Sequence, residues 1–319
     1  MTEKTKDLIK GFENKDRISL ARILTLVEKN AAADQKALAK LFNKARGIKK
    51  IGITGPPGAG KSTLINRLIG NFRKQKKTVA CVLVDPSSPI SGGAVLGDRI
   101  RMQEHFLDPG VFLRSVASRG EPGGLCKSAI EMALLLDAFG MDEIIIETVG
   151  VGQSEIEVAS IAETVLVVLT PEAGDAVQVL KAGLLEVGDI FVVNKADRPG
   201  AQALFYELDA MFEDVYSGKE KKKVLMVSAI ENKGIEELAA AIEQHRQFLD
   251  RTGKDHRRDL RRRHLIELVV SEFRGEIEEK LVKEHRKLVE EVCSAKISPH
   301  QALDKLDGLF KSLLKNKKK

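Results

Sequence analysis

The sequence has few cysteines and no long apolar run, and each shortage excludes a class of protein. Its three cysteines, Cys81, Cys126 and Cys293, lie far apart in 319 residues and form no C-x-x-C pair, which excludes a disulfide framework and a zinc site of the usual spacing. No run of about 18 apolar residues occurs, so we expect no transmembrane helix and no membrane partner. The first residues lack the apolar core of a secretion signal, and we therefore expect a cytoplasmic protein.

Aromatic residues are also scarce, at 4% of the chain, which leaves few side chains on which nucleic-acid bases could stack. The formal net charge is +6, and it is unevenly distributed: residues 1–50 and 251–319 each carry +7, so residues 51–250 carry −8. Basic ends of this kind could bind nucleic acid. Their lysines and arginines are interleaved with glutamates, however, and we favour solvated helix faces or an acidic protein partner over nucleic acid.

Residue patterns divide the chain into three predicted parts, an N-terminal helical extension (1–46), a nucleotide-binding domain (47–250) and a C-terminal helical arm (251–319). In the first part, apolar residues recur three or four positions apart, as in helices: Ile18, Ala21, Leu24, Leu38, Leu41 and Phe42. In the second part, short apolar runs alternate with helical stretches. The runs after the first are Val79–Val84, Val111–Val116, Glu143–Ile146, Thr164–Leu169, Ile190–Val193 and Val224–Val227. This alternation predicts an α/β fold with a mostly parallel sheet and helices on both faces.

The third part is predicted to be a long helix with one apolar stripe. The stripe comprises Ile266, Val270, Phe273, Ile277 and Leu281, and it is extended by Leu288 and Val292. A second helix is expected to begin at Ser298-Pro299, because serine caps helices and proline suits the first turn. The stripe could pack against the rest of the protein or form a seam with a second copy, and we favour a homodimer.

A phosphate-binding loop is the strongest motif in the chain. The pattern G-x-x-x-x-G-K-[ST] is met at every fixed position, after an apolar strand at 51–54 and before a helical pattern. Backbone N–H groups of such a loop surround phosphate oxygens, the lysine reaches the terminal phosphates and the serine hydroxyl binds Mg²⁺. The predicted phosphate-binding residues are Gly55, Pro56, Pro57, Gly58, Ala59, Gly60, Lys61, Ser62 and Thr63.

A second motif predicts recognition of guanine. Asn194-Lys195-Ala196-Asp197 follows an apolar strand and matches N-K-x-D. The Asp197 carboxylate can accept two hydrogen bonds from the guanine ring N–H and amino group, a donor pair that adenine lacks. We expect Asn194 to brace the loop and contact the guanine edge, and the Lys195 stem to cover the base. Another strand end supplies the remaining predicted nucleotide-binding residues, Ser228, Ala229 and Ile230.

Three acidic residues between these motifs are candidates for the metal site. Asp85 and Glu147 end apolar strands, and Asp98 lies in a glycine-rich stretch. A nucleoside triphosphate with Mg²⁺ needs carboxylates near the metal, so we assign these acids, with Ser62, to Mg²⁺. The alternative is that one of them caps a helix or pairs with a nearby arginine.

Five stretches carry a more specific resemblance: G-P-P-G-A-G-K-S, V-D-P-S-S-P-I-S-G-G-A-V-L-G-D-R, S-R-G-E-P-G-G-L, I-I-I-E-T-V-G-V-G-Q-S-E and V-V-N-K-A-D. Together they resemble the methylmalonyl-CoA mutase-associated GTPase family, the MeaB-like proteins, also called ArgK or LAO/AO transport kinases, of the SIMIBI class of P-loop GTPases. The resemblance covers roughly residues 15–250, and the helical third part fits it in kind. It implies a homodimeric GTPase that acts as a chaperone for a cobalamin-dependent acyl-CoA mutase, gating delivery of adenosylcobalamin and protecting the mutase.

The resemblance also implies roles for individual residues. Lys61, Glu147, Gln178 and Lys181 would serve hydrolysis, and the last two lie in a segment, Gly174–Lys181, that is similar to the third switch of the family. No D-x-H-x-x-G stretch is present, so we expect cobalamin to be bound by the partner and not by this chain.

The glycine after the metal-site strand bears on the rate of hydrolysis. Gly150 is followed by Val151, so no glutamine stands there to orient the attacking water, although Gln153 could compensate. We therefore expect slow intrinsic hydrolysis that accelerates when the mutase binds.

Three other functions are considered beside this one. A transport-linked P-loop ATPase or kinase would use ATP, which the N-K-A-D motif argues against. A metallochaperone GTPase of the hydrogenase or urease type would need clusters of cysteine and histidine to hold nickel or zinc, and the sequence has none. A nucleic-acid binder would bind duplexes with a steep salt dependence.

Overall fold

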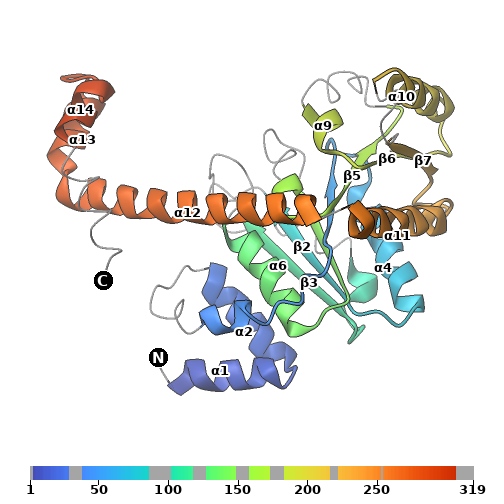
Figure 1. Cartoon of the computed structure of the whole chain (residues 1–319), viewed down its shortest axis with the longest axis horizontal. Helices are drawn as coiled ribbons and strands as arrows, with labels where there is room; N and C mark the ends of the chain where they lie inside the picture. The colour runs from blue at the N-terminus through green and yellow to red at the C-terminus, as the bar shows by residue number, and fades with distance from the viewer. Residues whose placement is uncertain are drawn as a thin grey trace. The chain divides into compact units, whose positions relative to one another are not determined.

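The structure is a computed structural model that describes residues 3–28, 38–85, 102–117, 127–148, 158–172, 183–215, 222–252 and 254–306. A seven-stranded parallel sheet, in the order β3-β2-β4-β1-β5-β6-β7, forms its centre (Figure 1). The strands are β1 (Ile51–Thr54), β2 (Val79–Asp85), β3 (Val111–Ala117), β4 (Glu143–Thr148), β5 (Thr164–Leu169), β6 (Ile190–Asn194) and β7 (Lys223–Val227). Each predicted apolar run forms one of these strands, so the predicted α/β fold is confirmed.

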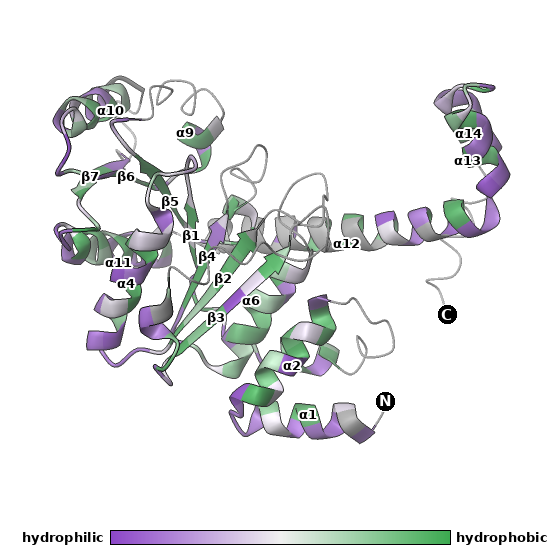
Figure 2. Ribbon diagram, turned by 180° about the vertical axis from the view of Figure 1, so that it is seen from behind, coloured by the Kyte–Doolittle hydropathy of each residue, from purple (hydrophilic) through white to green (hydrophobic). Residues whose placement is uncertain are grey.

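Helices cover both faces of the sheet, which is why the strands are apolar almost throughout (Figures 1 and 2). These helices are α4 (Lys61–Lys74), α6 (Lys127–Phe139), α9 (Leu185–Val187), α10 (Ala201–Val215) and α11 (Ile235–Thr252), with 3-10 turns η1 (Gln103–His105) and η2 (Val158–Ser160). Side chains alternate between the two faces of a strand. In β5, Leu166 and Val168 pack in the core with α4 and α11, whereas Val165 and Val167 pack in the core with α10. Cys81 is fully buried in the first of these cores.

The N-terminal extension packs against the nucleotide-binding domain. It contains α1 (Glu3–Glu13), α2 (Arg17–Glu28) and a short helix at 38–42. The helices were predicted, and Leu24 of the predicted repeat is fully buried, but Ile18 is 63% exposed while Leu20 and Ile23, outside that repeat, are fully buried. Contacts to the domain include the ring of Phe12 against Phe139, with centroids 5.2 Å apart. Asp137 also accepts a hydrogen bond of 2.7 Å from Gly47 N, which fixes the chain as it approaches β1.

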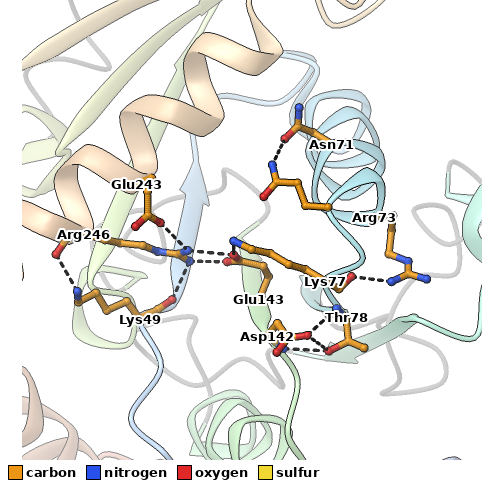
Figure 3. A network of polar contacts seen from close by, with 10 residues as sticks. Lys49, Asn71, Arg73, Lys77, Thr78, Asp142, Glu143, Glu243 and Arg246 are labelled. Carbon is orange, nitrogen blue, oxygen red and sulfur yellow. Dashed lines mark hydrogen bonds and ion pairs between the residues drawn. The ribbon is translucent and has the colours of Figure 1, made fainter.

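A buried ion network fastens the edge of the sheet at which β2 and β4 begin (Figure 3). Glu143, which is 1% exposed, accepts hydrogen bonds from both terminal nitrogens of Arg246, at 2.5 and 3.0 Å, and from Lys77 Nζ, at 2.7 Å. Lys49 Nζ donates to Arg246 O at 2.7 Å. The network therefore connects α11 with the strand β4 and with the segments that precede β1 and β2.

The chain divides into two compact units, Met1–Arg261 and Arg262–Lys319, and α12 (Lys254–Glu284) contributes to both. The second unit also contains α13 (Arg286–Cys293) and α14 (Pro299–Lys305). As predicted, α14 begins with a serine cap: Gln301 N donates to Ser298 Oγ at 3.2 Å and the Gln301 side chain accepts from Ser298 N at 2.9 Å. The division of the chain into three functional parts stays a prediction.

The predicted continuation of the apolar stripe beyond Leu281 is wrong. The helix is interrupted at His285, where φ is −121°, so Leu288 and Val292 lie on α13 and not on the same helix as Phe273. Phe273 and Leu281 instead pack with Leu288 and Leu306 inside the second unit. The interruption therefore lets the distal half of the stripe pack, partly buried, against residues of the chain's own next helices.

None of the helices in the described ranges is both long and apolar enough to cross a membrane.

Candidate functional site

The two nucleotide motifs lie at the carboxyl ends of parallel strands, the edge of the sheet at which α/β proteins bind ligands. The phosphate loop joins β1 to α4, the N-K-A-D motif begins at the last residue of β6, and Ser228 follows β7. Strands β1, β5, β6 and β7 are neighbours in the sheet. The order of the strands thus brings together segments that are more than a hundred residues apart in the sequence.

Two glycines of the phosphate loop are required by close contacts. Gly55 has a φ of +138°, and a Cβ there would lie 2.1 Å from Val168 O. Gly60 has a φ of +83°, and a Cβ there would lie 2.5 Å from Asn194 Nδ2. Any other residue would clash and would adopt an unfavourable left-handed conformation. The loop therefore has its shape because glycine occupies these positions.

Lys61 and Ser62, the first residues of α4, are both buried. The Lys61 ammonium donates to Gly55 O at 2.7 Å and to Pro56 O at 3.1 Å. It therefore lies among the backbone groups of the loop and supplies a positive charge beside the N-terminus of a helix, which itself favours anions.

Ser62 and Glu147 form a pair of oxygen donors at the end of β4. Ser62 Oγ donates to Glu147 Oε1 at 3.2 Å, and both side chains are buried. Hard cations such as Mg²⁺ prefer hydroxyl and carboxylate oxygens, so this pair fits one side of a magnesium site. Asp85 ends β2, which pairs with β4, so its backbone lies at the same edge of the sheet.

Asn194 connects the two motifs. Its side-chain Nδ2 donates to Ala59 O at 2.8 Å, and its Oδ1 accepts from Ala229 N at 3.2 Å. The side chain is buried, so these bonds are shielded from water. Asn194 thus braces the loop as predicted, whereas its contact with guanine stays a prediction.

Asp197 is held by the loop that follows β7. Ser228 Oγ donates to Asp197 Oδ1 at 2.6 Å, and Glu231 N donates to Ser228 Oγ at 3.3 Å. The hydrogen bond from Ser228 holds the pKa of the Asp197 carboxyl below its ordinary value. The carboxylate is therefore ionised at neutral pH, as an acceptor of two guanine N–H groups must be.

Two residues outside the motifs also belong to this site, and no pattern in the sequence predicted them. Arg67 Nε, from α4, donates to Ala229 O at 2.9 Å and so connects the loop after β7 to the helix that follows the phosphate loop. Glu172, after β5, forms ion pairs with Lys195 Nζ, at 2.7 Å, and with Arg198. Only their positions in space identify them.

Of the other predicted site residues, some are exposed at the surface and some lie outside the described residues. Thr63 and Ile230 are exposed at the surface of the site, Ile230 directly after the buried Ala229. Asp98, Gln178 and Lys181, together with the side chain of Asp85, lie outside the described residues.

The chain is similar to proteins named as GTPases over most of its length. A family model described as "Methylmalonyl Co-A mutase-associated GTPase MeaB" matches residues 20–285. A protein of Pyrococcus abyssi named as a GTPase is 42% identical over 306 residues, which cover 93% of this chain and 94% of that protein. The GTPase ArgK of Escherichia coli is 35% identical over 256 residues, 77% of each chain. The crystal structure of a LAO/AO transport system kinase has a TM-score of 0.71 at 26% identity and covers 98% of this chain and 99% of that one.

Proposed function

Because the chain belongs to the methylmalonyl-CoA mutase-associated GTPase (MeaB) family, and is therefore a GTPase with a P-loop fold, we propose that it hydrolyses GTP to control a cobalamin-dependent acyl-CoA mutase. The observation that supports the nucleotide part is Asn194, the first residue of the N-K-A-D motif, whose side chain donates to Ala59 O of the phosphate loop at 2.8 Å and accepts from Ala229 N of the loop after β7 at 3.2 Å. These bonds would hold the phosphate-binding and base-binding parts of one nucleotide site at a fixed separation.

Guanine would be recognised by Asp197. A carboxylate fixed by Ser228 presents an oxygen pair to the ring N–H and amino group of guanine, and adenine offers no matching donors. The aliphatic stem of Lys195 would cover one face of the base. The exposed side chain of Ile230 would cover its edge.

Phosphates would be bound by the backbone N–H groups of residues 58–62 and by the Lys61 ammonium, since Pro56 and Pro57 have no N–H to donate. The charged oxygens of GTP are stronger acceptors than the carbonyls of Gly55 and Pro56, so the Lys61 ammonium would exchange these carbonyls for phosphate oxygens. P-loop GTPases generally use Mg²⁺, which shields the phosphate charge during hydrolysis. Ser62 and Glu147 would hold it here, with Asp85 and Asp98 as further acidic residues of the site, and Gln178 and Lys181 would complete the catalytic set.

The mutase is proposed as partner from the description of the matching family. In this proposal the mutase binds cobalamin, and the GTPase gates the loading of adenosylcobalamin and protects the loaded enzyme. If intrinsic hydrolysis is slow and accelerates when the mutase binds, the time taken to hydrolyse GTP would set how long the two proteins stay in the GTP-bound complex.

A homodimer is proposed from the second unit of the chain. Leu265, Ile266, Val269 and Val270 lie one and four positions apart on α12, and each is more than 40% exposed. Residues with this spacing share one face of a helix, and burial of such a face needs an apolar partner. A second copy of the same helix meets that need.

The second candidate is a transport-linked kinase or ATPase, because one protein of similar structure is called a LAO/AO transport system kinase. One experiment separates the two candidates. Isothermal titration calorimetry should give a far lower dissociation constant for GDP and GTP than for ADP and ATP, and a candidate mutase should increase the rate of GTP hydrolysis. Equal affinity for adenosine and guanosine nucleotides would refute the proposal, and equal hydrolysis rates with and without mutase would remove the partner from it.

A further inference from the structure

Glu172 joins the loop after β5 to the base-recognition loop after β6. One carboxylate oxygen lies 2.7 Å from Lys195 Nζ, and the other contacts the guanidinium of Arg198. The backbones of the two segments also approach each other, because a Cβ built on Gly200 would lie 3.4 Å from Pro171 Cβ. A residue from outside the N-K-A-D motif thus holds the one lysine of that motif.

The backbone of Lys195 is fixed without help from Glu172. Its φ is +57°, and its carbonyl accepts from Arg198 N at 2.9 Å. The preceding residue, Asn194, is bonded on both sides of its amide, and Ala196 N donates to Val227 O at 3.0 Å. The part of the motif that these contacts leave mobile is the Lys195 side chain, whose four-carbon stem loses much rotamer entropy when it is ordered.

We propose that Glu172 is a positioning residue that orders the Lys195 stem before a guanine nucleotide arrives and so slows the release of that nucleotide. The inference rests on the proposed function, because the stem can cover a base only if guanine binds beside Asp197. An ion pair at the ammonium end extends the stem and leaves its methylene groups to contact the base. If the Lys195 side chain is ordered in advance, nucleotide binding does not have to supply the rotamer entropy lost on ordering it. Among closely related complexes, affinity gains of this kind appear mainly as slower dissociation.

The expected effect is modest and depends on salt. The Glu172 side chain is 42% exposed and that of Lys195 is 21% exposed, so solvent screens the pair. Loss of a partly exposed pair of this kind changes an equilibrium or rate constant by about two- to fivefold.

The test is the release of fluorescently labelled GDP, followed by stopped flow in the full-length protein. Glu172→Gln should release the nucleotide about two- to fivefold faster at low ionic strength, with an unchanged association rate, and should match the wild type at about 1 M salt. In a Lys195→Ala background, Glu172→Gln should have no further effect. Glu13→Gln is the matched control, since its pair with Lys44 is similarly exposed (44% for Glu13) and lies on the N-terminal extension; its release rate should equal that of the wild type.

Three results would overturn the inference: a wild-type release rate in Glu172→Gln, the same acceleration when Lys195 is already alanine, or an equal acceleration in Glu13→Gln. A failure of the proposed function is recognised separately. It would appear as a wild-type protein with no preference for guanosine over adenosine diphosphates, whereas a failure of this inference alone leaves that preference intact.

Discussion

Glu143→Ala should destabilise the first unit strongly, because it removes the carboxylate at the centre of the ion network in Figure 3. The Arg246 side chain, 12% exposed, would lose both of its hydrogen bonds to that carboxylate and would remain largely out of water. Lys77 is 35% exposed and can turn to solvent, so its share of the loss is smaller. Removing one partner of a buried ion pair costs about 3–5 kcal/mol.

Thermal unfolding followed by circular dichroism measures this effect. For a domain of this size, about 3–5 kcal/mol corresponds to a decrease in Tm of roughly 6–20 °C. Added salt should change the decrease little, because the Glu143–Arg246 pair is buried. Glu13→Gln again serves as the control, since an exposed pair contributes about 1 kcal/mol or less.

A double-mutant cycle assigns the loss to the pair. Arg246→Ala alone leaves the Glu143 carboxylate buried with Lys77 as its remaining ion-pair partner among the described residues, and the double variant removes both buried charges. The double variant should therefore be more stable than the sum of the two single losses predicts, by about 1–3 kcal/mol. Additive losses, or a loss below about 1 kcal/mol in Glu143→Ala, would refute the reasoning.

Three further predictions concern the nucleotide and the arm. Asp197→Asn should reduce the preference for guanine over adenine nucleotides by roughly two orders of magnitude or more in competition calorimetry, because the ionised acceptor pair is lost; an unchanged preference would remove Asp197 from base recognition. Ser228→Ala should raise the pKa of Asp197 towards its ordinary value, measured as the pH dependence of the Asp197 carboxyl NMR shift, since the Ser228 hydrogen bond lowers it. Because the folded-state pKa of Asp197 is depressed, its contribution to stability is present above the unfolded pKa and is lost as pH falls through the folded pKa. In Ser228→Ala the Asp197 carboxyl should therefore titrate at a higher pH than in the wild type. An identical titration would contradict the assignment. Leu265→Asp with Val269→Asp should convert a dimer to monomers in sedimentation velocity at unchanged Tm of the first unit; a monomeric wild type would refute the dimer.

The strands and the phosphate loop could be predicted from the sequence because short, continuous patterns identify them. A strand buried on both faces is a short apolar run between polar breaks, and Gly55 and Gly60 occupy positions where the backbone itself demands glycine. The bracing role of Asn194 followed from the motif that contains it. In each case the sequence pattern that identifies the feature spans only a few residues, although the contacts it makes, such as Gly55 with Val168 and Asn194 with Ala59, join distant parts of the chain.

The remaining features depend on contacts between distant residues. Glu143 and Arg246 are 103 positions apart, and Glu172 and Lys195 are 23 apart, so neither pair leaves a periodic pattern in the sequence. The buried face of α2 was misjudged at Ile18, because apolar spacing alone does not say which of two overlapping stripes meets the domain. Tertiary packing decided that question.

Strand β4 carries a buried carboxylate near each of its ends, Glu143 beside α11 and Glu147 beside Ser62. Glu143 and Glu147 are four residue steps apart, about 13 Å of extended backbone, and β1 and β2 hold the strand on both sides. Such a strand can neither stretch nor bend by much without breaking its ladder. The acid beside the phosphate loop and the acid that fastens α11 must therefore be displaced together, which gives opposite poles of the domain a stiff mechanical connection.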